Sequence, residues 1–254
     1  MPHRGCMHAA THALGRGYAI GRRRASTGAL QGAPRRAAPA LLAAAACVLS
    51  CATPALAGVR LSFFGGTAFQ APARLTVRQA GAEDLRFTAH YAAHPFTAPI
   101  YYAWRIAWWN AARPGAARGW ALELVHHKVF VTNPPPEIER FSVSHGLNLV
   151  SAMRLWEVGR AHLFAGIGPV ISHPESSIRG RVLEQRGGIF DAGYHWTGPQ
   201  LSVGAGTSAR VLGRAFVNVE ARGAAARVRV PVAGGSARFT HLGLHLMLGI
   251  EIRP

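Results

Sequence analysis

Residues 241–253 alternate in polarity without a break. Leucine or isoleucine occupies every even position from Leu242 to Ile252, while the odd positions hold His, Gly, Met, Glu or Arg. Such alternation places one kind of side chain on each face of an extended strand. Six successive aliphatic side chains exceed a soluble strand of ~5 to 6 residues, whereas membrane-spanning strands run for ~9 to 11 residues. The pattern therefore predicts a strand with one face toward lipid.

Seven further strands are predicted by the same alternation between Gly, Pro and Arg-Gly turn signals. Their ranges are 58–69, 99–110, 119–132, 143–156, 161–173, 194–209 and 214–229. Eight is the smallest usual number of strands in an outer-membrane barrel, whose narrow lumen is filled by side chains. We expect an all-β fold, an eight-stranded antiparallel transmembrane β-barrel of the outer-membrane type.

The predicted connections differ in length between the two ends of this barrel. Three are short, at 111–118, 157–160 and 210–213, and three are longer, at 70–98, 133–142 and 174–193. Outer-membrane barrels have short periplasmic turns and longer external loops. The long connections are therefore expected outside the cell and both barrel termini in the periplasm, with the brief connection at 230–235 as an exception.

The first 57 residues differ from the rest of the chain. They contain seven arginines and no acidic residue, an uncharged apolar run at 37–49, and the small-residue cleavage signal Ala55-Leu56-Ala57. This arrangement is typical of a secretory signal peptide with a long basic start. We expect a cleaved signal at 1–57 and a barrel at 58–254, with a lipoprotein signal acylated at Cys51 as the alternative.

The net charge of +17 would suit a nucleic-acid-binding protein. Seven of the 28 basic residues precede residue 58, however, and only Lys128 is a lysine. Arginine enrichment beside abundant Ala and Gly follows from nucleotide composition as readily as from function. We therefore expect no nucleic-acid partner.

Polar side chains gather at the outward-facing ends of the third to sixth strands. They are His126, His127, Lys128, His145, Asn148, His173, Glu175, Asp191, Tyr194 and His195, with Glu123 and Glu220 deeper on the lumen side. Histidine titrates near neutral pH and is the commonest metal ligand, and a carboxylate beside it orients it or acts as a base. In the structural alternative, the rim residues are solvated or bind lipopolysaccharide phosphates, and Glu220 pairs with an arginine in a plugged lumen.

Several stretches occur in an order that resembles one known family. They are Pro99–Tyr102 with Arg105 and Trp108-Trp109, Glu123 with His126–Phe130, Gly146–Asn148 with Met153-Arg154 and Trp156, Gly166–Gly168 with His173 and Glu175, Tyr194 with Thr197–Pro199, and Glu220 with Arg222. The family is the bacterial outer-membrane lipid A oxidases. The resemblance implies an eight-stranded barrel that oxidises the proximal glucosamine of lipid A to 2-aminogluconate, with dioxygen as the oxidant. His127 and Arg222 depart from the family pattern, which has an acid and a lysine there.

Roles for individual residues follow from this resemblance and the residue chemistry. Catalysis is expected from His126, His173, Glu220 and Glu123, and substrate binding from Lys128, Asn148, Arg105, Tyr194 and Arg222. A divalent metal held by His126, His173 and a carboxylate is a hypothesis for moving electrons to dioxygen. We expect a monomer in the outer membrane of a Gram-negative bacterium, with lipid A or lipopolysaccharide as its partner.

Three alternatives stay open. A non-catalytic outer-membrane barrel would use the same rim residues to bind lipopolysaccharide. A lipid A deacylase would use Ser144-His145 as its nucleophile and base. A soluble lipocalin-like binder would bury the aliphatic face of residues 242–252 in its interior.

Overall fold

The computed structural model of the chain describes residues 58–110 and 117–254. The expected signal peptide at 1–57 and most of the expected turn at 111–118 lie outside these ranges. In the part of the chain that the structure describes, no helix is long and apolar enough to cross a membrane.

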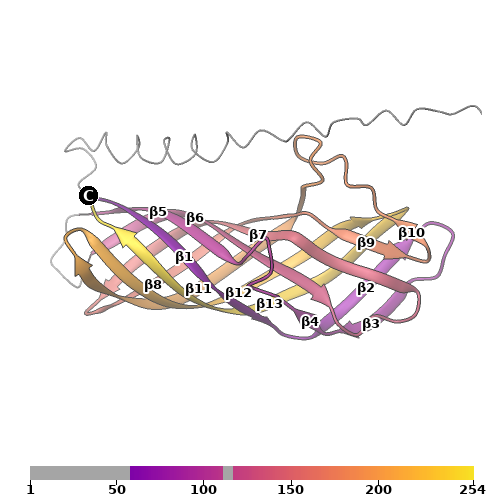
Figure 1. Cartoon of the computed structure of the whole chain (residues 1–254), viewed down its shortest axis with the longest axis horizontal. Helices are drawn as coiled ribbons and strands as arrows, with labels where there is room; N and C mark the ends of the chain where they lie inside the picture. Colours follow the sequence, from indigo (N-terminus) through magenta and orange to yellow (C-terminus); the bar gives the residue numbers. More distant parts are fainter. Residues whose placement is uncertain (1–57, 111–116) are drawn as a thin grey trace, which may run out of the picture. The chain divides into compact units, whose positions relative to one another are not determined.

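Eight antiparallel strands within the described ranges form a closed ring, because the last strand, β13, pairs with the first, β1 (Figure 1). In ring order they are β1 (Val59–Gln70), β5 (Tyr102–Trp109), β6 (Arg118–Val131), β7 (Ile138–Val158), β8 (Ala161–Ser172), β11 (His195–Leu212), β12 (Ala215–Val232) and β13 (Gly235–Ile252). Closure leaves no unpaired strand edge in the ring, as a barrel in lipid requires. The predicted eight-stranded antiparallel barrel is confirmed, and each predicted strand range overlaps an observed one.

The outer face of the ring carries an apolar belt. The even-numbered side chains of β13 from Leu242 to Ile250 are exposed, while its odd-numbered side chains face the lumen and are buried. Exposed large apolar side chains continue the belt on β1, β5, β6, β8, β11 and β12: Phe63, Trp104, Trp120, Leu122, Leu163, Ile167, Leu201 and Val219. A lipocalin-like barrel would bury its apolar face, so that alternative is excluded. The belt is the lipid-facing surface of an outer-membrane barrel, which places the protein in the bacterial outer membrane as expected.

The polarity of β12 and β13 inverts partway along both strands. Arg227 and Thr240 are register partners. Between this pair and the barrel end that carries Ala215 and Ile252, the outer face of both strands is apolar and the lumen face is polar. Beyond the pair, Arg229 faces outward, whereas Val228 and Phe239 are buried inside the ring. The inversion marks the level at which the wall leaves the membrane. β13 begins at Gly235, before the start at residue 241 that the apolar alternation predicts, because its first residues lie beyond the membrane and have no apolar outer face.

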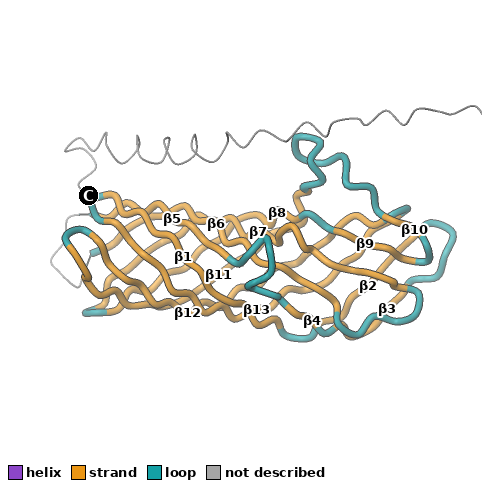
Figure 2. Tube along the Cα trace, in the orientation of Figure 1, coloured by secondary structure: helices purple, strands orange, loops and turns teal. Residues whose placement is uncertain are grey.

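The two longest connections, expected as loops, contain short strands. These are β2 (Ala73–Gln79), β3 (Leu85–Ala89), β4 (Tyr91–Ala92), β9 (Glu175–Ile178) and β10 (Arg181–Val182). The hairpin β2–β3 pairs with the start of β13, β4 pairs with β6, and β9 pairs with β7, so the ring continues beyond the membrane (Figure 2). Leu75, Val77 and Ile178 from these strands pack with the apolar interior of β12 and β13. A packed core therefore closes the outer end of the barrel.

The opposite end of the barrel carries the termini. β1 begins and β13 ends there, as the pairing of Leu61 with Ile252 requires. Short turns at 159–160 and 213–214 join the strands at this inner end, whereas the long connections lie at the outer end, as the sequence predicts.

Candidate functional site

A polar group lies on the outer wall of the barrel, where β5, β6 and β7 run side by side. Tyr102, His126 and Asn148 are register partners on these three strands and share the outer face. The His126 ring stacks on the Tyr102 ring with centroids 4.7 Å apart, and its Nδ1 lies 2.9 Å from Asn148 Oδ1. Because an amide oxygen accepts, Nδ1 carries the proton and Nε2 keeps its lone pair. Among the described residues this buried Nε2 has no hydrogen-bond partner.

This row of residues lies at the membrane boundary. The same register continues from Asn148 through Ile171 to Trp196, which is 66% exposed, as expected of an interfacial aromatic residue. One row closer to the membrane centre, the outer face is apolar, with Trp104 paired to Leu124. His126 therefore lies at the boundary between the lipid tails and the headgroups.

A second group of side chains adjoins His126 at the outer rim. The His173 ring lies 4.9 Å from the ring of His145 and 5.0 Å from that of Tyr194, measured between centroids. Glu175 accepts hydrogen bonds from Ser144 Oγ at 2.5 Å, from His145 Nδ1 and from Arg140. His145, His173 and Glu175 offer ligand atoms within 4.8 Å of one another. This rim group is one of two described sets that could hold a metal ion.

Gly146 connects the two groups. Its backbone φ is 121°, which favours glycine, and a Cβ atom at this position would lie 2.5 Å from the His126 ring. The carbonyl of Gly146 accepts a hydrogen bond from the His173 backbone N–H at 3.1 Å. The lack of a Cβ atom at Gly146 thus allows β7 to pack against His126, and the Gly146 carbonyl holds the backbone of His173 by a hydrogen bond. The structure brings His126 and His173 to one region, but the described ligand set at the rim pairs His173 with His145 and Glu175.

Two rim residues have shifted pKa values. Burial, followed by the neighbouring His145, lowers the pKa of His173, so the ring is neutral at pH 7. Burial raises the pKa of Glu175, but the hydrogen bond from Ser144 and the charges of Arg140 and His145 outweigh it and lower the pKa below its usual value. The rim thus combines a neutral imidazole with an ionised carboxylate.

The remaining predicted substrate-binding residues of the rim are also placed. Lys128 Nζ donates to the Thr97 carbonyl at 2.7 Å, which ties β6 to the connection before β5. Tyr194 Oη donates to the His145 carbonyl at 3.4 Å. Tyr194 therefore belongs to the rim group, whereas Lys128 is held against the connection that precedes β5.

The predicted residues Arg105, Glu123, Glu220 and Arg222 lie elsewhere, in a buried ion network inside the lumen. Arg105 binds Glu220 through two hydrogen bonds of 2.7 Å and Glu123 through bonds of 2.6 and 2.8 Å. Arg222 pairs with Glu123, and His162 Nε2 lies 2.9 Å from Glu220. Toward the termini, the network borders a cavity of ≈ 780 Å³ lined in part by Arg105 and His162. These charges neutralise one another and plug the lumen, as the structural alternative supposed for Glu220.

Ser144 and His145 do not have the geometry of a nucleophile and its base. Ser144 Oγ lies 3.3 Å from His145 Nδ1, the same ring nitrogen that binds Glu175. In a serine hydrolase the acid and the nucleophile contact different nitrogens of the imidazole. The pair therefore gives the deacylase alternative no support.

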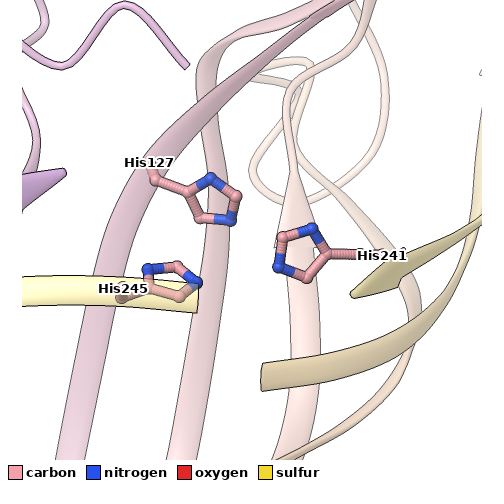
Figure 3. A group of neighbouring side chains, drawn as sticks. All are labelled: His127, His241 and His245. Atoms are coloured by element: carbon pink, nitrogen blue, oxygen red, sulfur yellow. The ribbon is translucent and has the colours of Figure 1, made fainter. Parts of the chain in front are cut away.

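Three further histidines meet inside the barrel, and their proximity could not be predicted from the sequence. His127 on β6 and His241 and His245 on β13 turn their rings toward one another, with all three buried (Figure 3). The inward positions of the last strand read His-x-Gly-x-His, but nothing in the sequence shows that β6 faces them across the lumen. Only the three-dimensional arrangement reveals the cluster.

The outer wall also carries a groove rich in arginine. It has a volume of ≈ 590 Å³, and its lining includes Arg74, Arg227, Arg229 and Arg238. No ion pair joins any of these four arginines to another described residue. An apolar groove of ≈ 720 Å³ lies beside it on the membrane side and shares Pro199, Arg227 and Thr240 with it. The two grooves thus place four arginines directly above an apolar surface at the membrane boundary.

Comparison with known proteins finds similarity at the level of structure. No family model matches the chain, and no curated protein matches it. The crystal structure of Neisserial surface protein A (NspA) is 10% identical, covers 78% of this chain and 97% of its own, and gives a TM-score of 0.36. The crystal structure of Ail, the attachment invasion locus protein of Yersinia pestis, is 11% identical, covers 75% of this chain and 98% of its own, and gives a TM-score of 0.31.

Proposed function

We propose that this protein oxidises the proximal glucosamine of lipid A to a 2-aminogluconate unit, with dioxygen as the oxidant. The observation that carries the proposal is the position of His126, a buried imidazole with an unpartnered Nε2 on the outer wall, at the edge of the apolar belt. The sugars of lipid A occupy this level of the outer leaflet. The resemblance of the surrounding stretches to lipid A oxidases supports the same assignment.

The proposed reaction starts at the anomeric carbon of the sugar. His126 Nε2 accepts the proton of the C1 hydroxyl as a general base. The C1–H bond breaks, and its two electrons, with two protons in all, reduce dioxygen to hydrogen peroxide. The lactone that remains adds water across its C1–O bond and opens to the acid. The sugar therefore gains one oxygen atom.

The rim group next to His126 supplies further roles in this proposal. Asn148 holds His126 in the required tautomer, and we assign binding of the sugar to Lys128, two residues from His126 on β6, and to Tyr194 of the rim group. A divalent metal bound at His173 with a carboxylate would supply a route for electrons to dioxygen, and Glu175 is the carboxylate within reach. Glu123 and Glu220, committed to arginines in the lumen, are assigned no step.

A non-catalytic barrel that binds lipopolysaccharide is the second candidate, and the arginine groove favours it. Arg74, Arg227, Arg229 and Arg238 would bind phosphate groups, since the guanidinium offers paired donors to phosphate oxygens. Acyl chains would occupy the apolar groove below. This function requires no chemistry at His126. In either case we propose that the protein acts as a monomer.

Mass spectrometry of lipid A separates the two candidates. Lipid A is compared from cells that lack the protein, cells that make it, and cells that make His126→Ala or His173→Ala. An oxidase adds one oxygen atom to the proximal sugar, and both variants lose this product while still showing the heat-modifiable band of a folded barrel.

His90→Ala serves as the matched control, because this exposed histidine lies outside the His126 group, the rim group and the lumen cluster of His127, His241 and His245. Unchanged lipid A in cells that contain the folded wild-type barrel would overturn the oxidase proposal and leave the lipopolysaccharide-binding candidate. Oxidation that persists in His126→Ala would overturn the assignment of His126 as the base.

A further inference from the structure

We infer that His127, His241 and His245 form a transition-metal site of the zinc class, buried in the barrel interior and separate from the rim. The three rings lie with centroids 4.8 Å (His127 to His241), 4.9 Å (His127 to His245) and 5.9 Å (His241 to His245) apart. One ligand nitrogen from each ring lies within 4.8 Å of the others. The inference is independent of lipid oxidation.

Four ring nitrogens of the three histidines lack hydrogen bonds. Nε2 of His241, Nε2 of His245 and both ring nitrogens of His127 are buried and have no partner among the described residues. A buried polar atom without a partner is unfavourable, because it has lost its hydrogen bonds to water. Several such atoms converging on one point are unfavourable unless something binds there. A cation that accepts lone pairs would satisfy all three rings at once.

Gly243 provides the space for that cation. It lies between the two histidines of β13 on the inward face, and a Cβ atom there would lie 2.8 Å from His241 Nε2 and 3.2 Å from His245 Nε2. Any larger residue would fill the point toward which both nitrogens are directed. The glycine therefore keeps open a pocket bounded by imidazole nitrogens.

The other nitrogens of the β13 histidines are anchored, as in known metal sites. His241 Nδ1 lies 3.0 Å from Gln70 Oε1, and His245 Nδ1 lies 3.1 Å from the Tyr101 hydroxyl. An Nδ1–H group that donates to such an oxygen leaves Nε2 free as the ligand. Partners of this kind orient the ring and are typical of histidines that bind metals. Gln70 and Tyr101 would thus form the outer shell of the site.

The ligand type selects the class of metal. Three neutral imidazoles suit Zn²⁺ and its first-row neighbours, whereas Mg²⁺ and Ca²⁺ prefer oxygen ligands. Tetrahedral Zn²⁺ with three histidines keeps its fourth position for water or hydroxide. Zn–N bonds of about 2.0 to 2.1 Å require nitrogens about 3.4 Å apart, so the rings would close inward on the ion. The carboxylates of Glu123 and Glu220 are not free to bind the metal ion, since both are bound to arginines.

Because the cluster is buried, metal would load as the barrel folds. The test is to refold the urea-denatured full chain into detergent with Zn²⁺ or Co²⁺ and then to remove free metal on a chelating resin. Elemental analysis is expected to give one ion per chain. Co²⁺ in a tetrahedral site is expected to show strong visible absorption, a readout that does not depend on any enzymatic activity.

Four variants locate the ion. The double variant His241→Ala/His245→Ala is expected to lose it, and Gly243→Ala is expected to lose it while keeping every ligand. Gln70→Leu is expected to weaken binding about 10- to 100-fold. Gly65→Ala is the matched control, because a Cβ atom at this strand glycine meets nothing within 4 Å, and it is expected to retain the ion.

The rim group provides the other control. His145→Ala/His173→Ala is expected to keep the buried ion, even if it abolishes lipid A oxidation. Wild-type barrel that refolds with less than a tenth of an ion per chain would overturn the inference, as would full occupancy in the His241→Ala/His245→Ala variant. Loss of the ion in the rim variant alone would place the metal at the rim and also overturn it.

Discussion

Arg105 and Glu220 face each other across the lumen through two hydrogen bonds of 2.7 Å, although 115 residues separate them in the sequence. Arg105 lies on β5 and Glu220 on β12, so the contact spans the ring rather than a pair of neighbouring strands. Bidentate pairing of this kind is the strongest form of arginine–carboxylate contact. It braces opposite walls of the barrel.

Glu220→Gln is expected to destabilise the barrel by about 3 to 5 kcal/mol, because it leaves Arg105 with an incompletely neutralised buried charge. Urea unfolding of the detergent-solubilised or vesicle-inserted barrel measures the change. The comparison is Asp84→Asn, which removes the exposed ion pairs with Arg78 and Arg86 and should leave the unfolding midpoint nearly unchanged. Equal midpoints for Glu220→Gln and wild type would contradict the brace.

Leu246→Arg is expected to weaken membrane insertion by about 2 to 4 kcal/mol, since Leu246 lies in the centre of the apolar belt on β13. Thr240→Arg, on the same face of the same strand at the boundary, is expected to cost about 0 to 1 kcal/mol. Folding yields in lipid vesicles at graded urea concentrations compare the two. Similar penalties at both positions would show that the boundary is misplaced.

Acidification is expected to destabilise the rim through His173. Its pKa is lowered in the folded barrel, so below its usual value of 6.5 the unfolded chain binds more protons than the folded one. This part of the stability is complete above pH 6.5 and is lost as the pH falls through the folded pKa. The urea midpoint should fall between neutral and mildly acidic pH, and it should fall less in His173→Gln. An identical fall in the variant would disprove the contribution.

Arg227→Ala/Arg229→Ala is expected to weaken binding of lipopolysaccharide several-fold and to reduce its dependence on salt, because the two arginines line the outer-wall groove. Fluorescence titration with lipopolysaccharide vesicles at low and high salt measures both effects. Arg210→Ala, which changes an exposed arginine at the inner end, is the control. If both variants bind alike, the groove does not hold the phosphates.

The barrel itself was predictable because membrane strands follow a local rule. The polarity of each residue from Leu242 to Ile252 predicts which face of the strand it occupies. The same rule predicts the bounds of the other strands to within a few residues over the membrane. This rule does not apply outside the membrane, where the outer face of the barrel contacts water instead of lipid. Beyond Thr240 the surroundings are water, so the apolar side chains move to the inside of the ring. Residues 73–79 and 85–89 also alternate between apolar and polar side chains. They are shorter than a membrane strand of ~9 to 11 residues, and a rule built on membrane-length strands therefore assigns them to a loop.

The candidate site was predictable only in part. The proximity of His126 to Asn148 follows from strand order, because both stand at equivalent heights on neighbouring strands. The meeting of His127 with His241 depends on which residues face each other across the lumen. That relationship is fixed by the tilt and stagger of the closed ring, which no single stretch of sequence encodes.

The packed core at the outer end has a consequence for whatever meets this bacterium from outside. The visible part of the protein is the continued barrel wall with hairpins fixed onto it, since Leu75 and Val77 anchor β2 against the ends of the long strands. An antibody, a phage or a host receptor would therefore encounter a preformed surface of stable shape. Recognition of that wall would require little ordering on binding, whereas digestion by host proteases would begin at the exposed segment 183–192, which belongs to no strand.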